Sequence, residues 1–199
     1  MYESELKKVI KGEMKFNDLF KFIKTKCIVL PILDVFHSVK SGRNKIINNI
    51  LKIGKKCNLI SSEELNEILE LNDATLEDKS TLGRMNDQYA INLFQIHNVI
   101  KAFNKNHNTS GLYLFIFTII LEVFRNIYIE LQFRIDLSKL VLYLLWFFYQ
   151  NIFNVPKNTC LKKNKKSKKK YVWFSDKISL IKLINTIICL LIILDDPEL

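Results

Sequence analysis

The sequence predicts an all-α protein that folds as a single domain. Its 199 residues are 49% hydrophobic and 25% charged, which suffices for one core and excludes a wholly disordered chain. Apolar residues recur at intervals of three and four along most of the chain, which is the period of amphipathic helices. The dipeptides Asn-Gly and Asp-Gly, which mark tight β-hairpins, are absent. We therefore expect seven or eight helices.

The first third of the chain predicts two helices separated by a short break. The first covers Phe16 to Val39, and Pro31 is expected to kink or split it near Leu30. The tripeptide Ser-Gly-Arg then interrupts the pattern. Asn44 is expected to cap a second helix that Gly54 ends. Its apolar positions are Ile46, Ile47, Ile50, Leu51 and Ile53.

The middle of the chain predicts two further helices around a polar loop. The segment "SSEELNEILEL" begins with a capping box formed by Ser61 and Glu64. The polar stretch 72–85 is expected to be a loop, and a helix is expected over 87–103. One side of that helix is expected to be an apolar stripe of Leu93, Ile96, Ile100 and Phe103. The stripe beside it contains Ile91, Gln95, Asn98 and Ala102.

Three strongly apolar helices are expected in the second half, over 112–131, 137–153 and 178–194, with Pro156 ending the second. A membrane span needs about 20 apolar residues. The first two segments are interrupted by charges or too short, so we interpret them as buried helices. The third also fits a short tail anchor. The expected organisation is a helical domain over 1–156, a basic loop over 157–174 and a C-terminal apolar helix over 175–199.

Positive charge is concentrated in one segment. Residues 157–170 contain eight lysines and no acid, and subtracting these from the net charge of +10 leaves about +2. The segment is either a solvated loop or a patch for anionic lipid headgroups, where each basic residue contributes about 1 kcal/mol. A nucleic-acid partner is not expected, because no groove-reading motif surrounds the lysines. The expected membrane-contacting residues are Lys165, Lys166, Lys168, Lys169 and Trp173.

Catalytic and metal-binding motifs are missing from the sequence. It contains no glycine-rich phosphate loop, no GxSxG and no CxxC pair, and its three histidines belong to no catalytic motif. We therefore expect no enzyme activity, no cofactor and no metal. The N-terminus lacks the apolar run of a signal peptide. We expect a cytoplasmic monomer with reduced thiols that is peripheral at membranes.

Three motifs occur in an order that resembles the glycolipid transfer protein family. They are "LPILD" at 30–34, "NNILKI" at 48–53 and "LFQIHNVIKAF" at 93–103. In that family LPxFD precedes a helix of the pattern D-x-x-x-N-I-x-K, and a later helix reads L-x-L-x-R-x-L. The resemblance covers 16–103 and extends more weakly to Pro156. It implies a two-layer helical sandwich that binds a sphingolipid headgroup at its surface and shelters the lipid chains between the layers.

The resemblance also implies a set of headgroup-binding residues. Asn49 and Lys52 match the family's Asn and Lys, and on a helix they would share one face. Their amide and ammonium groups can bind a sugar or a phosphate. Lys45 stands where the family has Asp, and this cation favours a phosphate. On the later helix the matching positions are Gln95 for Trp or Arg, His97 for Lys or His, and Asn98 for Arg.

The sequence departs from the family at its site histidine. That position would fall on Leu140, and no histidine follows His107. Either the site is eroded or the C-terminal half is a misread gene model. The function expected is transfer of a sphingolipid, with ceramide 1-phosphate favoured over a glycolipid. The alternatives are a tail-anchored or peripheral membrane protein without transfer activity, and a helical interaction module, in which "NNILKI" is a solvated helix face and His97 a core-edge residue.

Overall fold

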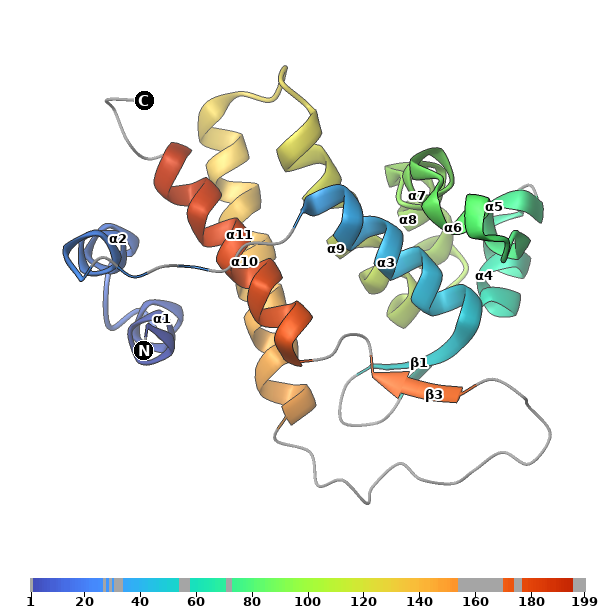
Figure 1. Ribbon diagram of the computed structural model, residues 1–199, viewed down its shortest axis with the longest axis horizontal. Coiled ribbons are helices and arrows are strands. Elements are labelled where there is room, and N and C mark those ends of the chain that lie inside the picture. Colours follow the sequence, from blue (N-terminus) through green and yellow to red (C-terminus); the bar gives the residue numbers. More distant parts are fainter. Residues whose placement is uncertain are drawn as a thin grey trace.

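The structure is a computed structural model that describes residues 2–26, 28, 30, 34–53, 58–70, 73–153, 170–173 and 177–194. These residues form eleven helices and one three-stranded sheet, so the all-α prediction is confirmed (Figure 1). Several helices have only five to ten residues, which is why the number exceeds the seven or eight expected. The helices are α1 (Glu3–Ile10), α2 (Phe16–Thr25), α3 (Val35–Asn48), α4 (Ser62–Leu69), α5 (Asp73–Glu77), α6 (Thr81–Met85), α7 (Asp87–Leu93), α8 (Ile96–Asn104), α9 (Asn108–Arg125), α10 (Leu131–Phe153) and α11 (Lys177–Leu194).

The three long apolar helices α9, α10 and α11 form the centre of the core, as their composition predicts. Figure 1 shows α10 and α11 side by side, with α1 and α2 on one side and α4 to α8 on the other. One side of α11 is completely covered, and its buried apolar residues are Leu180, Leu183, Ile184, Ile187, Ile188 and Leu191. At the opposite end of the chain, the Tyr2 hydroxyl donates a hydrogen bond to Asn185 on α11. The helix that also fitted a tail anchor therefore packs inside this fold.

α9 is the one helix of the described residues that is long and apolar enough to cross a membrane, and 61% of it is buried. It ends at Arg125, six residues before the expected end. Asn126 leaves the helical conformation, and its side chain accepts a hydrogen bond from the Tyr128 N–H at 3.1 Å. Such asparagine-centred turns compete with helix, which explains the early stop.

α3 differs from the sequence-based prediction at both ends and in the middle. It starts at Val35, where Asp34 caps it by accepting from the Phe36 N–H at 3.0 Å. It then runs without a break through Gly42, so the predicted break and the Asn44 cap are wrong. A Cβ on Gly42 would lie 2.8 Å from the ring of Phe117, so the missing side chain lets α3 approach α9 closely. Pro31 and Gly54 lie outside the described residues.

A strand replaces the later part of the predicted helix over 44–54, whose first residues, 44–48, are the end of α3. β1 (Asn49–Ile53) pairs antiparallel with β2 (Asn58–Ile60) and parallel with β3 (Lys170–Trp173). The β-branched isoleucines of β1 favour a strand. The pairing also gives backbone partners to a segment that follows directly on a helix end. Four residues of the predicted basic loop 157–174 therefore form the edge strand β3.

The middle of the chain is helical, as predicted, but the side of the helix that is buried differs from the prediction. The cap is as predicted, since Ser61 accepts from the Glu64 N–H at 3.2 Å, but the predicted loop 72–85 contains α5 and α6. The predicted helix over 87–103 breaks after Leu93, and α8 starts anew at Ile96. This break rotates the apolar stripe outward. Within it, the exposed residues are Ile96 (56%), Ile100 (52%) and Phe103 (40%).

Arg43 is the polar centre of this region and is fully buried. Its Nε donates to the Thr75 carbonyl at 2.6 Å, its Nη1 to the Gly83 carbonyl at 3.0 Å and its Nη2 to the Asp78 carbonyl at 3.3 Å. The guanidinium also lies over the Tyr89 ring, 5.1 Å from its centre. One side chain thus ties α3 to α5, α6 and α7.

The pKa of Arg43 reflects this burial. Removal from water lowers the pKa of Arg43, while Asp78 and Tyr89 raise it. Because an arginine starts from a pKa far above neutral, the group stays charged. The carbonyl groups of Thr75, Asp78 and Gly83 accept hydrogen bonds from the guanidinium and so stabilise its positive charge. Hydrogen bonds from the Ser80 side chain and N–H lower the pKa of Asp78.

We expect Arg43→Met to lower the free energy of unfolding by about 3 kcal/mol. Methionine has a similar length but leaves three carbonyl groups without their donor, and each such loss costs about 1–3 kcal/mol, partly recovered by water. Urea unfolding followed by circular dichroism measures the change. The matched control is Arg84→Met on the exposed end of α6, which should cost less than about 0.5 kcal/mol. Equal losses in the two variants would contradict the anchoring role of Arg43.

Candidate functional site

A groove lined mainly by residues of polar type runs along α3 and is closed on one side by the end of α6. Its volume is about 380 Å³. We call it the α3 groove, and its lining consists of His37, Lys40, Ser41, Asn44, Lys45, Asn48, Asn49, Arg84 and Met85. Six of these residues are spaced three or four apart on α3, which places them on one helix face.

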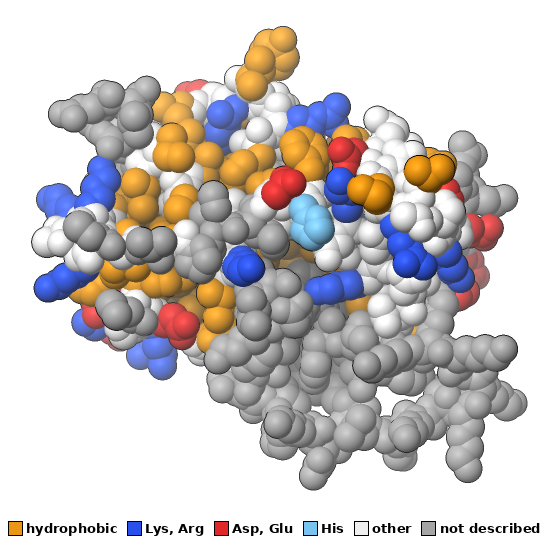
Figure 2. All heavy atoms as spheres, in the orientation of Figure 1, with side chains coloured by type: hydrophobic (Ala, Val, Ile, Leu, Met, Phe, Trp, Pro, Cys, Tyr) orange, Lys and Arg blue, Asp and Glu red, His pale blue; other side chains and the backbone are white. Residues whose placement is uncertain are grey.

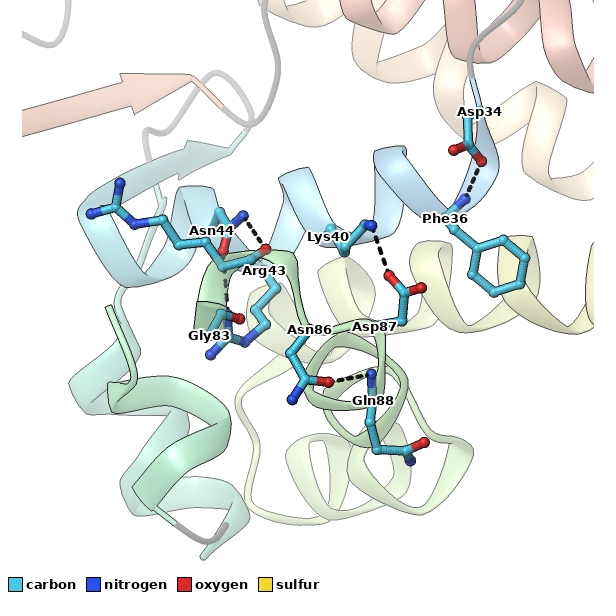
Figure 3. Close-up of polar contacts among 10 residues, drawn as sticks. Asp34, Phe36, Lys40, Arg43, Asn44, Gly83, Asn86, Asp87 and Gln88 are labelled. Carbon is cyan, nitrogen blue, oxygen red and sulfur yellow. Dashed lines mark hydrogen bonds and ion pairs between the residues drawn. The ribbon is translucent and has the colours of Figure 1, made fainter. Parts of the chain in front are cut away.

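The walls of the groove are held together by backbone-directed hydrogen bonds. The Asn44 side chain donates to the Arg84 carbonyl at 3.0 Å. Its neighbour Arg43 donates to the Gly83 carbonyl from the buried side of the same helix (Figure 3). α6 itself begins with a Ser80 cap that accepts from the Gly83 N–H at 2.9 Å. A helix of only five residues is thereby fixed against α3, and Arg84 reaches the groove.

The described lining of the groove is basic. It includes Lys40, Lys45, Arg84 and His37, and no acidic side chain belongs to it. Asp87, at the start of α7, pairs with Lys40 at 2.8 Å and offsets one of these charges (Figure 3). Amide groups of asparagines lie between the cations. Ammonium, guanidinium and amide donors together suit a phosphate or another compact anion.

Two of the sequence-predicted headgroup residues lie in this groove. Lys45 and Asn49 both line it, and the Asn49 side chain donates to the Lys45 carbonyl at 3.1 Å, at the end of α3. The prediction that Asn49 and Lys52 share one helix face is wrong, however. Both belong to β1, where positions three apart lie on opposite faces, rather than to one helix face. The Lys52 side chain lies outside the described residues.

The other predicted headgroup residues lie elsewhere. Gln95 is half-buried at the N-terminus of α8, and His97 is exposed on that helix. Asn98 is buried, and its amide donates to the carbonyls of Asn92 at 2.8 Å and Leu93 at 3.0 Å, where it caps the end of α7. α8 packs on α9 and α4, so the structure does not bring these three residues to the α3 groove.

Of the predicted membrane-contacting residues, Trp173 belongs to the strand β3 and the four lysines lie outside the described residues. These lysines are Lys165, Lys166, Lys168 and Lys169. Trp173 is the last residue of β3, and its Cα pairs with that of Lys52. Asn49 pairs in the same way with Lys170. The end of the lysine-rich segment therefore adjoins the strand that leaves the α3 groove.

Sequence reasoning missed the contributions of His37, Lys40 and Arg84. The first two follow the same three-and-four spacing as Asn44, Lys45 and Asn48, so an uninterrupted helix would have placed them on one face. The expected break at 41–43 concealed this pattern. Arg84 had no local signal, because tertiary contacts bring α6 to α3.

A second hollow on the surface has the opposite character. It measures about 520 Å³ between α4 and α5, and its charged lining comprises Glu63, Glu67, Glu77 and Lys79. Its negative charge disfavours an anion, so the α3 groove is the better candidate for a phosphate. No family model, curated protein sequence or solved structure matches this chain. What the groove can bind is therefore inferred from its own residues.

We expect Asp87→Asn to strengthen the binding of inorganic pyrophosphate to the α3 groove by about two- to fivefold. The substitution removes the carboxylate that pairs with Lys40, and one exposed charge pair at contact distance is worth about 1 kcal/mol in water. Isothermal titration calorimetry at low salt measures the affinity. The matched control is Glu70→Gln, which breaks the 2.9 Å pair with Lys105 outside the groove. An equal gain in both variants would mean that pyrophosphate does not bind in the groove.

Proposed function

We propose that the protein is a non-enzymatic, intracellular lipid transfer protein that binds a phosphate-bearing sphingolipid such as ceramide 1-phosphate. The observation that carries the proposal is the α3 groove, in which Lys40, Lys45 and Arg84 line one hollow without a described acid. The headgroup phosphate would be held there by cations and asparagine amides. A sugar headgroup is less well served, because the described lining holds no aromatic ring on which a sugar could stack.

The position of the groove beside the sheet supports action at a membrane. β1 leaves the groove at Asn49 and pairs with β3, whose first residue, Lys170, ends the lysine-rich segment. Clustered lysines are attracted to anionic membrane surfaces. The residues proposed to approach the bilayer are Lys165, Lys166, Lys168, Lys169 and Trp173. The headgroup site and the basic segment would then face the same surface.

The apolar helices are the proposed shelter for the lipid chains, as the resemblance to the glycolipid transfer protein family implies. α3 carries the groove and also contacts α9 and α11. In the described structure the facing side chains of α9, α10 and α11 fill the core. Uptake of a lipid would therefore require these helices to separate, and the gain is the burial of the lipid chains at about 25 cal/mol per Å².

We expect native mass spectrometry to detect a one-to-one lipid adduct after the protein is mixed with vesicles that contain ceramide 1-phosphate. Replacing two of the groove cations, Lys45→Ala with Arg84→Ala, should reduce the adduct at least tenfold, because two charge-assisted contacts are lost. Lys52→Ala tests in the same way the sequence-based prediction that Lys52 binds the headgroup. The matched control is Lys105→Ala, an exposed lysine on another face that pairs with Glu70.

A comparison of two lipids separates the contribution of the headgroup to binding from that of the chains. Ceramide has the same chains without the phosphate and should give little adduct. Equal adducts with ceramide and ceramide 1-phosphate, or an adduct that survives the double substitution, would contradict binding of the phosphate in the groove. Circular dichroism of each variant verifies that the fold is intact.

A further inference from the structure

The turn between α9 and α10 and the first residues of α10 expose four large apolar side chains within seven residues. The exposed fractions are 75% for Ile127, 92% for Tyr128, 56% for Leu131 and 56% for Phe133. We call these four residues the apolar tip. Given the size of such side chains, their exposed area is on the order of 500 Å², which matches the largest apolar patch of a typical monomer. Neither the core nor the α3 groove accounts for this exposure.

The turn beneath the apolar tip is well ordered by hydrogen bonds. Asn126 organises it, because its side chain accepts from the Tyr128 N–H at 3.1 Å and donates to the Glu122 carboxylate at 3.0 Å. The Asn126 carbonyl accepts from the Arg134 guanidinium and, at 3.5 Å, from the Ile129 N–H. Several of the turn's polar groups are thus paired within the protein. Such pairing lowers the cost of moving a turn from water into a less polar medium.

The shape of this region favours a bilayer over a protein partner. Figure 2 shows hydrophobic side chains projecting at the top of the view, where Figure 1 places the turn between α9 and α10. A convex apolar projection offers no groove for a peptide, whereas it can enter the boundary between headgroups and acyl chains. Tyrosine is enriched at that depth, because its ring is apolar and its hydroxyl is polar.

The charges near the apolar tip fit the headgroup level. Arg125 ends α9 and Arg134 lies in the first turn of α10, so a cation stands at the base of the turn on each helix. Glu130 is the acid within the turn itself. The exposed Arg125 guanidinium can contact lipid phosphates while the apolar side chains lie deeper, and the half-buried Arg134 holds the turn through the Asn126 carbonyl. With the carboxylates of Glu122 and Glu130 beside the two cations, entry into the bilayer is driven by apolar area rather than by net charge.

We propose that the apolar tip inserts into the interface of a lipid bilayer and docks the protein there. This membrane contact is separate from the lysine-rich segment and does not require an occupied α3 groove. Because it depends on apolar burial, it holds for zwitterionic lipids and at high salt, where surface electrostatics are screened. It also stands if the groove binds no lipid.

The test is flotation of the full chain with pure phosphatidylcholine vesicles in 0.5 M salt, a screened condition chosen from the short Debye length there. We expect the wild type to float, and Ile127→Ser with Tyr128→Ser to weaken its partitioning at least tenfold, since burial of one large apolar side chain is worth about that factor. The matched control is Ile96→Ser with Ile100→Ser on α8, at 56% and 52% exposure, which should partition like the wild type.

Three results would overturn the proposal. The first is that the wild type does not bind neutral vesicles. The second is that the tip variant and the α8 variant bind vesicles equally well. The third is that the tip substitutions change only the oligomeric state of the protein, measured by sedimentation without lipid. The last result would assign the apolar tip to a contact between protein chains. Lys45→Ala with Arg84→Ala keeps the apolar tip, so it should float normally even if it loses the ceramide 1-phosphate adduct. The two proposals can therefore fail independently.

Discussion

The buried guanidinium of Arg43 is the interaction on which the arrangement of the middle of the chain depends. Short helices such as α5 and α6 are not stable alone, because each has too few internal hydrogen bonds to offset its nucleation cost. Arg43 supplies donors to the carbonyls of Thr75, Asp78 and Gly83 and so fixes both helices against α3. The side chain that organises the fold from within thereby also brings Arg84 to the outer wall of the α3 groove.

The sequence alone predicts the long helices well, because α9, α10 and α11 are apolar over many turns and need no distant partner to be recognised. The Ser61 cap is likewise local and is correct. The errors occur where tertiary contacts override local signals. Gly42 reads as a break but serves a close helix contact with Phe117. The strand β1 pairs with β2 and also with β3, a distant partner that no local pattern reveals. The face of α8 is set by the break before it, where Asn98 completes the end of α7.

The candidate site was predictable only in part. Lys45 and Asn49 were found through a family resemblance, and both line the α3 groove, although a helix end and a strand place them there instead of one helix face. Gln95, His97 and Asn98 came from the same resemblance, but α8 holds them away from the groove. His37 and Lys40 required knowledge that α3 is continuous, and Arg84 required knowledge of how α6 folds back. Residue type was thus easier to infer than proximity.

The parallel pairing of β1 with β3 has a consequence for the order in which the protein folds. β3 is synthesised long after β1, so during translation β1 has only β2 as a partner and keeps one edge open. Pairing between segments so distant in sequence is slow, because a long loop must close before any hydrogen bond forms. The pairing of β1 with β3 therefore forms only after residues 170–173 have been synthesised. Until then the open edge of β1 can pair with other chains.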